Sequence, residues 1–160
     1  MTQRQLILLA AGGSAALLAG AFAFQMLGYP PCALCLWQRW PHAAAVAIGV
    51  LALGFGARGL LPRALALLGA AAAAVTAGIG LYHTGVERGW WEGPSSCTSA
   101  GGGLGGLSGG ALLPGTEIAP VVMCDEVAWQ LFGISMASWN AAISLALAGL
   151  WILAATARAR

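Results

Sequence analysis

Four long apolar runs divide this chain, and each is close to the length of a membrane-spanning helix. The runs cover approximately residues 6–27, 40–57, 64–82 and 134–155. About 20 residues of helix cross the ~30 Å of hydrocarbon in a bilayer, and open strands would leave backbone groups unpaired in lipid. Only 8% of the residues are charged, against roughly a quarter in soluble domains. We therefore predict an all-α membrane protein, a four-transmembrane-helix bundle that forms a single integral membrane domain over residues 1–160.

The second run is the least regular of the four. Pro41 and His42 lie near its start, and in a continuous helix the proline ring conflicts with the carbonyl of Trp37. We expect this helix to begin near Pro41, which leaves Cys35 and Arg39 in an irregular segment before it.

The charged residues indicate which side of the membrane each loop faces. With four spans, five arginines fall on one side and all five acidic residues fall on the other. The first set is Arg4, Arg58, Arg63, Arg158 and Arg160, and the second is Glu87, Glu92, Glu117, Asp125 and Glu126, joined only by Arg39 and Arg88. Because arginine in short loops marks the cytoplasmic side, both termini are expected there, and loops of about residues 28–39 and 84–132 face outward. The net charge of +2 is too small to indicate a nucleic-acid partner.

The N-terminal run permits one alternative. Arg4, the apolar run and Ala21-Phe22-Ala23 loosely match a signal peptide with an A-x-A cleavage site. Cleavage would leave three spans and place the two termini on opposite sides. The run is longer than a usual signal core and continues to Leu27, which favours a retained helix.

The second outward loop is long and rich in glycine. Its middle, residues 101–110, reads GGGLGGLSGG, a composition typical of flexible coil. Cys97 and Cys124 lie on either side of this stretch. Long loops of this kind are usually either functional or disordered, and the two cysteines favour a function.

All four cysteines fall in the two outward loops. Cys32 and Cys35 form a C-x-x-C in the first loop, and Cys97 and Cys124 lie in the second. Three pairings are possible, and the spacing does not choose among them. A structural disulfide is reasonable for Cys97 and Cys124, where it would close a flexible loop, but a bridge across three positions restrains almost nothing. C-x-x-C is the spacing of redox-active dithiols, so thiol–disulfide exchange is favoured.

Two other kinds of site fit the spacing less well. A zinc site would need a second C-x-x-C or a pair of histidines at regular spacing, and Cys97 and Cys124 do not provide one. Covalent haem attachment requires histidine directly after the second cysteine, where this chain has Leu36. We predict no metal site.

Arg39 and His83 are the polar residues expected beside the dithiol. Arg39 follows Cys35 by four positions, so in helical conformation the two side chains share one face. A cation there would favour the Cys35 thiolate and an electron-rich ring above it, although an interfacial arginine can also simply extend to the headgroups. His83 ends the third run at the same outer level. A lone histidine there is more often a hydrogen-bonded helix-end residue, and its placement opposite Arg39 is what favours a function.

The residues around the first cysteine pair resemble a known family. Residues 32–39 read CALCLWQR, which resembles the C-x-L-C-x-x-x-R signature of the DsbB family, disulfide bond formation proteins of bacterial inner membranes. The likeness covers nearly the whole chain, with a cysteine pair in each outward loop and a histidine within Tyr82-His83-Thr84. Gln38 departs from the glutamate of the best-known members, and we assign it no role. The glycine-rich middle of the second loop is also more extreme than expected.

The resemblance implies a quinone-dependent thiol:disulfide oxidoreductase of the bacterial inner membrane, with both termini cytoplasmic and the cysteine loops periplasmic. A reduced periplasmic thioredoxin-like partner of the DsbA type would attack a Cys97–Cys124 disulfide through Cys97. Cys124 would then exchange with Cys32, and Cys35 would pass the electrons to ubiquinone or menaquinone. This cycle would sustain disulfide bond formation in periplasmic proteins.

The same likeness implies that Arg39 lines the quinone site together with Cys35, with His83 nearby. Two alternatives stay open: a specialised paralogue that serves one dedicated substrate, and a non-enzymatic membrane scaffold with two structural disulfides. Proteins of the vitamin K epoxide reductase type also combine four helices with two cysteine pairs. Their C-x-x-C follows the loop pair, whereas here it precedes that pair, which argues against this third possibility.

Overall fold

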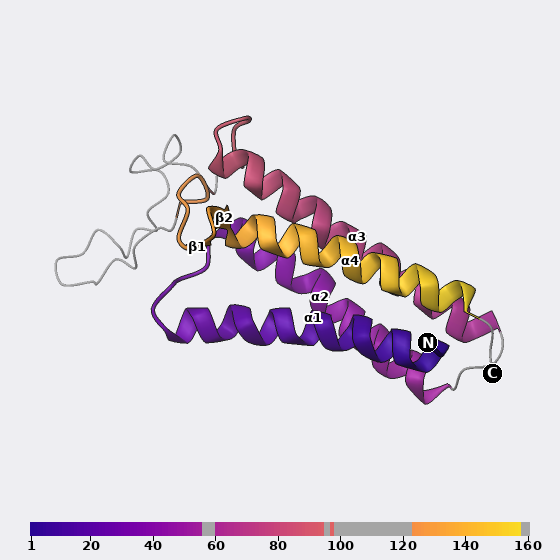
Figure 1. Cartoon of the computed structure of the whole chain (residues 1–160). Helices are drawn as coiled ribbons and strands as arrows, with labels where there is room; N and C mark the ends of the chain where they lie inside the picture. Colours follow the sequence, from indigo (N-terminus) through magenta and orange to yellow (C-terminus); the bar gives the residue numbers. More distant parts are fainter. Residues whose placement is uncertain (56–59, 95–96, 98–122, 158–160) are drawn as a thin grey trace, which may run out of the picture.

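The fold is built from four helices and one short hairpin. The computed structural model describes residues 1–55, 60–94, 97 and 123–157. Within these residues the elements are α1 (Gln3–Met26), α2 (Ala33–Gly54), α3 (Leu60–Glu87), β1 (Gln130–Leu131), β2 (Ile134–Ser135) and α4 (Met136–Thr156). The helices form an elongated bundle, with the hairpin at one end and both the start of α1 and the end of α4 at the other (Figure 1).

Each helix in the bundle packs mainly against two neighbours. α3 lies against both α2 and α4, and α1 lies against the same two helices, so α1 and α3 are diagonal to one another. The β1–β2 hairpin leads directly into α4, with Gln130 opposite Ser135. Its two turn residues, Phe132 and Gly133, both have positive φ, the conformation that closes a two-residue hairpin with the right-handed strand twist. The hairpin therefore fixes the entry of α4 at this end of the bundle.

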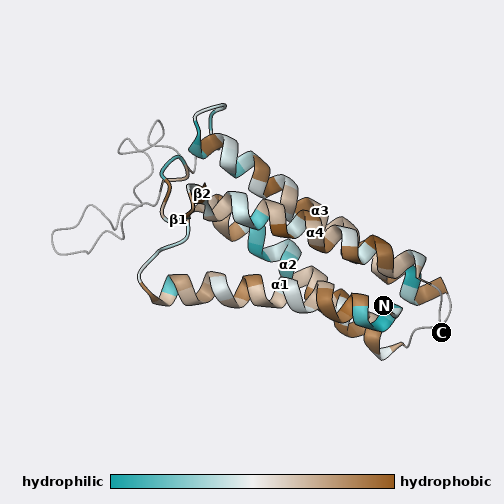
Figure 2. Ribbon diagram, viewed as in Figure 1, coloured by the Kyte–Doolittle hydropathy of each residue, from teal (hydrophilic) through white to brown (hydrophobic). Residues whose placement is uncertain are grey.

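Three of the four predicted spans are confirmed as helices with the length and apolar character needed to cross a membrane. These are α1, α3 and α4. Large apolar side chains such as Leu67, Val75 and Ile152 point outward from them, as expected for a surface that faces lipid. Figure 2 shows apolar residues along these helices and a hydrophilic group in the part of α2 toward the hairpin. α2 is less apolar because it carries Gln38, Arg39 and His42.

The expected start of the second helix is wrong. α2 begins at Ala33 and runs through Pro41 without a break, so residues 33–39 are helical. Cys32 caps the helix, since its sulfur accepts a hydrogen bond from the backbone N–H of Cys35. A proline inside a helix removes one backbone hydrogen bond, and packing against α1 and α3 offsets that loss. Cys35 and Arg39 therefore lie on the first turns of a helix rather than in an irregular segment.

The other boundaries differ at the helix ends. α1 begins at Gln3 because Thr2 and Gln5 form a reciprocal capping box, and α3 extends beyond 64–82 in both directions. Residues 84–87 of the predicted second loop are helical, and residues 130–131 belong to the hairpin. The glycine-rich residues 101–110 lie outside the described residues.

The core of the bundle is made from small residues packed around one large aromatic side chain. Trp151 of α4 is fully buried, and a Cβ atom added at Gly69 of α3 would lie 2.6 Å from its ring. Gly49 of α2 is equally close to Ala11 of α1, where an added Cβ would come within 2.4 Å of the alanine Cβ. Small residues at such positions let membrane helices approach closely.

We expect Gly69→Ala to destabilise the bundle, because the added methyl group meets the rigid Trp151 ring. The predicted loss of unfolding free energy is about 1–3 kcal/mol, measured by thermal or denaturant unfolding in detergent. Gly78→Ala on the same helix is the matched control, since nothing lies within 4 Å of its added Cβ. Equal effects at the two positions would show that the contact with Trp151 does not limit the helix spacing.

Candidate functional site

The first cysteine pair lies at the N-terminus of α2. Cys32 is the N-cap and Cys35 belongs to the first helical turn, and their sulfur atoms are 2.8 Å apart. Cys32 is buried, whereas Cys35 is partly exposed. Backbone N–H groups at a helix N-terminus favour negative charge, so the helix start supports a thiolate in this pair.

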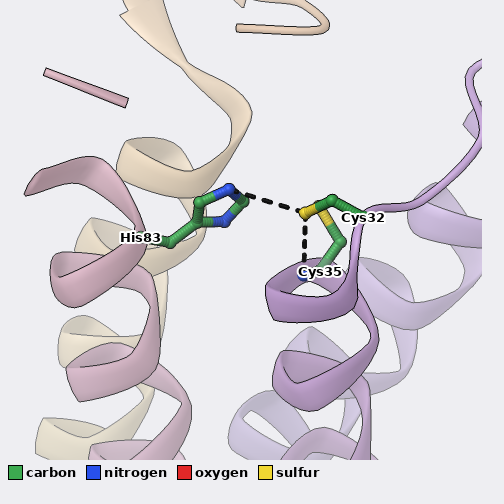
Figure 3. Close-up of side chains that lie close together, drawn as sticks. All are labelled: Cys32, Cys35 and His83. Carbon is green, nitrogen blue, oxygen red and sulfur yellow. Dashed lines mark hydrogen bonds between the residues drawn. The ribbon is translucent and has the colours of Figure 1, made fainter. Parts of the chain in front are cut away.

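His83 from the end of α3 faces this pair. Its Nε2 atom is 3.6 Å from the Cys32 sulfur, and the close-up in Figure 3 shows the imidazole ring directed at that atom. The same nitrogen is 3.9 Å from Oε1 of Glu87, one turn further along α3. The Glu87 carboxylate in turn accepts a hydrogen bond from the Ser135 hydroxyl at the start of α4.

The second cysteine pair is joined and packs against the first. Cys97 and Cys124 form a disulfide with a Cα–Cα distance of 5.0 Å, and the backbone N–H of Cys124 donates to the carbonyl of Cys97 at 2.8 Å. Both residues belong to a buried cluster that also contains Cys32, Leu34 and Val86. The structure therefore brings together both cysteine pairs that the sequence placed in separate loops.

The two thiols of the first pair have pKa values shifted in opposite directions. The pKa of Cys35 is lowered because the Cys32 thiol donates a hydrogen bond to its sulfur, and the positive charge of Arg39 acts in the same direction. The pKa of Cys32 is raised because its proton is held in that hydrogen bond and because the side chain is buried. The reduced pair therefore carries its negative charge on Cys35.

A chain of hydrogen bonds continues from His83 across the bundle. Nε2 of Gln38 lies 3.1 Å from Nδ1 of His83, and Oε1 of Gln38 accepts from Nδ2 of Asn140 at 2.6 Å. Oδ1 of Asn140 lies 2.9 Å from Nε2 of His42. The chain thus links α2, α3 and α4 through four polar side chains, of which Gln38, His42 and His83 are buried.

Two backbone carbonyls fix the direction of every bond in this chain. The Gln38 side chain also contacts the carbonyl of Leu34, which can only accept, so the contacting atom must be the amide nitrogen. Thr76 donates its single hydroxyl hydrogen to the carbonyl of Gln38, so the Asn140 atom beside the Thr76 oxygen must also be a nitrogen. Donors therefore run from His42 through Asn140 and Gln38 to His83, whose Nε2–H points at the Cys32 sulfur.

Arg39 contacts α1 rather than the cysteine sulfurs. Its guanidinium donates to Oε1 of Gln25 at 2.8 Å and to the carbonyl of Ala21 at 3.3 Å. It also lies over the ring of Phe22, 4.8 Å from the ring centre. Arg39 therefore joins α1 and α2 at the level of Cys35 and places a positive charge there.

A pocket of about 210 Å³ opens beside Cys35. One wall is a single face of α2, formed by Cys35, Gln38, Arg39 and His42, and His83 and Asn140 complete its polar part. The remaining lining is largely apolar and aromatic, with contributions from Leu17, Phe24, Tyr29, Trp129 and Trp139. A mostly apolar cavity with a few convergent polar groups is typical of a small-molecule site. The predicted residues Cys35, Arg39 and His83 all line it.

The geometry of the first pair matches a dithiol better than a metal site. Cys32, Cys35 and His83 place their ligand atoms within 4.8 Å of one another, so three potential ligands are present. Two thiolates on one tetrahedral zinc ion lie roughly 3.8 Å apart, whereas these sulfurs are 2.8 Å apart. The short separation suits closure to a disulfide.

Sequence reasoning missed three members of the site: Gln38, His42 and Asn140. Gln38 was assigned no role, and His42 and Asn140 were not considered as site residues. A signal was present, because polar residues inside apolar membrane runs usually face the bundle interior and mark functional sites. The sequence did not indicate that these residues meet in one site, because His42 and Asn140 lie 98 positions apart in the chain.

We expect Cys35 to be the first thiol of the reduced pair to react with an alkylating reagent. Its lowered pKa keeps a larger share of Cys35 than of Cys32 as thiolate at a given pH, and Cys35 is the more exposed of the two residues. Brief iodoacetamide treatment at about pH 7, followed by peptide mass spectrometry, should label Cys35 at least about tenfold faster than Cys32. With rising pH the Cys35 rate should level off first. Faster labelling of Cys32 would contradict the charge assignment.

Comparison with known proteins points to one family. The family model of the disulfide bond formation protein DsbB matches residues 3–154. Disulfide bond formation protein B of Xanthomonas oryzae pv. oryzae is 32% identical over 148 residues, covering 91% of this chain and 86% of the relative. The protein of the same name from Xanthomonas campestris pv. campestris is 33% identical over 141 residues, covering 87% and 81%. No solved structure matches the chain.

The match covers nearly all of the four helices and includes both cysteine pairs. It agrees with the apolar helices and with the joined and open cysteine pairs. The chain belongs to the DsbB family of disulfide bond formation proteins, thiol:disulfide oxidoreductases of the bacterial inner membrane.

Proposed function

We propose that this protein oxidises a periplasmic dithiol protein of the DsbA type and passes the electrons to membrane quinone. The observation that carries the proposal is the position of Cys35. Cys35 lines a mostly apolar pocket, and it packs beside a buried cluster that holds the other three cysteines. The Cys32–Cys35 pair can therefore exchange with the Cys97–Cys124 disulfide, while Cys35 contacts a small electron acceptor in the pocket.

The partner step uses the Cys97–Cys124 disulfide. A reduced thioredoxin-like partner attacks Cys97, and Cys124 leaves as a thiolate. Cys97 is only 1% exposed, so this attack requires displacement of the residues that cover it. In the structure the outer pair, Cys97 and Cys124, is a disulfide, and the inner pair, Cys32 and Cys35, is reduced. This arrangement corresponds to the stage after the electrons have passed from the outer pair to the inner pair.

The internal step is exchange between Cys124 and Cys32. Both sulfurs belong to the same buried cluster, which supports direct thiolate attack without a long movement of the helices. His83 donates a hydrogen bond to Cys32, which favours the Cys32 thiolate in the later step in which Cys97 attacks Cys124 and Cys32 leaves. When the inner disulfide opens at Cys32, Cys35 leaves as the lower-pKa thiolate.

The pocket residues fit a quinone. The apolar and aromatic lining suits a flat ring with an isoprenoid tail, and Arg39 places a positive charge where the ring gains electron density. A membrane quinone, when bound, supplies a two-electron acceptor that reoxidises the inner pair. Cys35 presents the thiolate to the pocket, Cys32 closes the disulfide, and the aromatic lining excludes water.

We also propose the membrane orientation. α2 is taken as the fourth span, because it packs against both α1 and α3. The arginine-rich ends of the bundle face the cytoplasm and the cysteines face the periplasm, as the arginine distribution indicates. The start of α1 and the end of α4 lie at the same end of the bundle, which is consistent with four spans.

The proposal is tested with the purified protein, a reduced thioredoxin-like partner and a short-chain ubiquinone. We expect the loss of quinone absorbance to match the amount of partner disulfide formed, because both are two-electron changes. Cys35→Ser should reduce quinone reduction to the uncatalysed rate. A membrane scaffold with two structural disulfides would show no partner-dependent quinone reduction, and that result would overturn the proposal. Rates with several reduced substrates would reveal a paralogue dedicated to one of them.

We expect Arg39→Ala to raise the apparent KM for quinone by about tenfold, because a charge-assisted contact contributes about 1.5–3 kcal/mol. Exchange between Cys97 and the partner should be unchanged. Gln25→Ala is the matched control, since it removes the side-chain acceptor of Arg39 on α1 and keeps the cation. An equal KM increase in both variants would assign Arg39 to helix packing rather than to the ring.

A further inference from the structure

The chain of hydrogen bonds from His42 to His83 begins at a residue that lines the pocket, and one ring nitrogen of that residue is not used in the chain. His42 lines the pocket and is 3% exposed. Its Nε2 atom is occupied by Oδ1 of Asn140 at 2.9 Å, with the Ser144 hydroxyl 3.5 Å away. Its Nδ1 atom is buried and has no hydrogen-bond partner among the residues that the structure describes. A buried polar atom left without a partner costs free energy, which indicates that something else fills this position.

The chemistry of that missing partner follows from the direction of the chain. Asn140 presents its oxygen to His42, so Nε2 of His42 carries the hydrogen. In a neutral imidazole the other ring nitrogen is then an acceptor. Nδ1 of His42 therefore requires a hydrogen-bond donor, and a carbonyl oxygen cannot satisfy it.

His42 is well placed to meet a ring held at Cys35. The two residues are seven positions apart on α2, which places them on the same helix face, about 10 Å apart along the axis. Gln38 and Arg39 lie between them on that face, and all four residues line the same pocket. A ring in this pocket can therefore have one edge at the Cys35 sulfur and the opposite oxygen near His42.

A quinone and its reduced form differ in whether their ring oxygens can donate a hydrogen bond, which is what Nδ1 of His42 requires. Oxidation of the inner pair to a disulfide releases two electrons, and a quinone that takes them up with two protons becomes a hydroquinone. The quinone has only carbonyl acceptors at its two ring oxygens, whereas the hydroquinone has two hydroxyl donors.

We propose that Nδ1 of His42 accepts a hydrogen bond from a ring hydroxyl of the hydroquinone, so that the pocket binds the reduced ring more tightly than the oxidised ring. This inference rests on the proposed quinone site and names the oxidation state that the site prefers. If the pocket binds the hydroquinone more tightly than the quinone by some factor, the equilibrium between the bound quinone and the bound hydroquinone shifts toward the hydroquinone by the same factor. His42 thereby makes the bound quinone a stronger oxidant of the inner pair.

The test compares the affinity of the two ring forms. Decylubiquinone and decylubiquinol are titrated under anaerobic conditions into protein with a Cys32→Ser background, in which the inner pair cannot close and consume the ligand. Trp129 and Trp139 line the pocket, so quenching of tryptophan fluorescence reports binding. In this background His42→Phe should raise the Kd of the hydroquinone about five- to tenfold, the value of one hydrogen bond, and change the Kd of the quinone less than about twofold.

Two further variants separate this effect from a general loss of structure. Ser144→Ala removes a second contact of His42 Nε2 without touching the pocket, and both Kd values should stay within about twofold of the parent. The double variant His42→Phe with Asn140→Leu removes both members of the hydrogen bond, so the Asn140 oxygen is not left unpaired if the single variant folds poorly, although the Gln38 oxygen then loses its donor. It should show the same selective loss of hydroquinone binding.

The possible outcomes separate the inference from the proposed function. An unchanged hydroquinone Kd in both His42 variants, or equal losses for the two ring forms, would overturn the role of His42 while leaving the quinone site in place. If neither ring form binds the parent protein, the quinone site itself fails, and the inference fails with it.

Discussion

The amide of Gln38 holds the site together, because one side chain satisfies partners on three helices. It donates to His83 of α3, accepts from Asn140 of α4 and bonds to the backbone of its own helix. An amide can do this because it carries donors and acceptors on the same planar group. Inside a membrane bundle no water competes for these bonds, so a change at this residue would leave several buried groups unpaired.

The composition of α2 reflects the need for polar side chains that form these hydrogen bonds. α1, α3 and α4 are apolar enough to be recognised as spans by composition alone, whereas α2 carries the polar face that lines the pocket. Gln38 and His42 are buried, because α2 packs against α1 and α3. α2 therefore depends on its neighbours for stability in the membrane, and the same packing allows the helix to continue through Pro41.

Hydrogen-bonding and charged neighbours act on both sulfurs of the first cysteine pair, Cys32 and Cys35. The positive charge of Arg39 acts on Cys35, and His83 donates to Cys32 while lying beside the Glu87 carboxylate. The negative charge rests on Cys35, which lines the pocket, because the Cys32 thiol donates a hydrogen bond to the Cys35 sulfur. This division separates the two halves of the chemistry within one C-x-x-C. The burial of the Cys97–Cys124 disulfide keeps the second pair in contact with Cys32.

Most of the architecture could be predicted from the sequence. The apolar runs predicted helices at all four places, and the C-x-x-C predicted a redox pair, since both signals depend on residues close together in the chain. The start of α2 could not be predicted, because the local effect of Pro41 favours a break and only tertiary packing overrides it.

The sequence by itself determined a helical membrane protein with two cysteine pairs and an arginine beside one of them. The tertiary structure alone decided that His83, Gln38, Asn140 and His42 form one directed chain of hydrogen bonds that ends at a pocket. The physical reason is that helical periodicity fixes which residues share a face of one helix, whereas the packing of helices decides which faces meet. Gln38 and Asn140 are 102 positions apart, and no local pattern connects them.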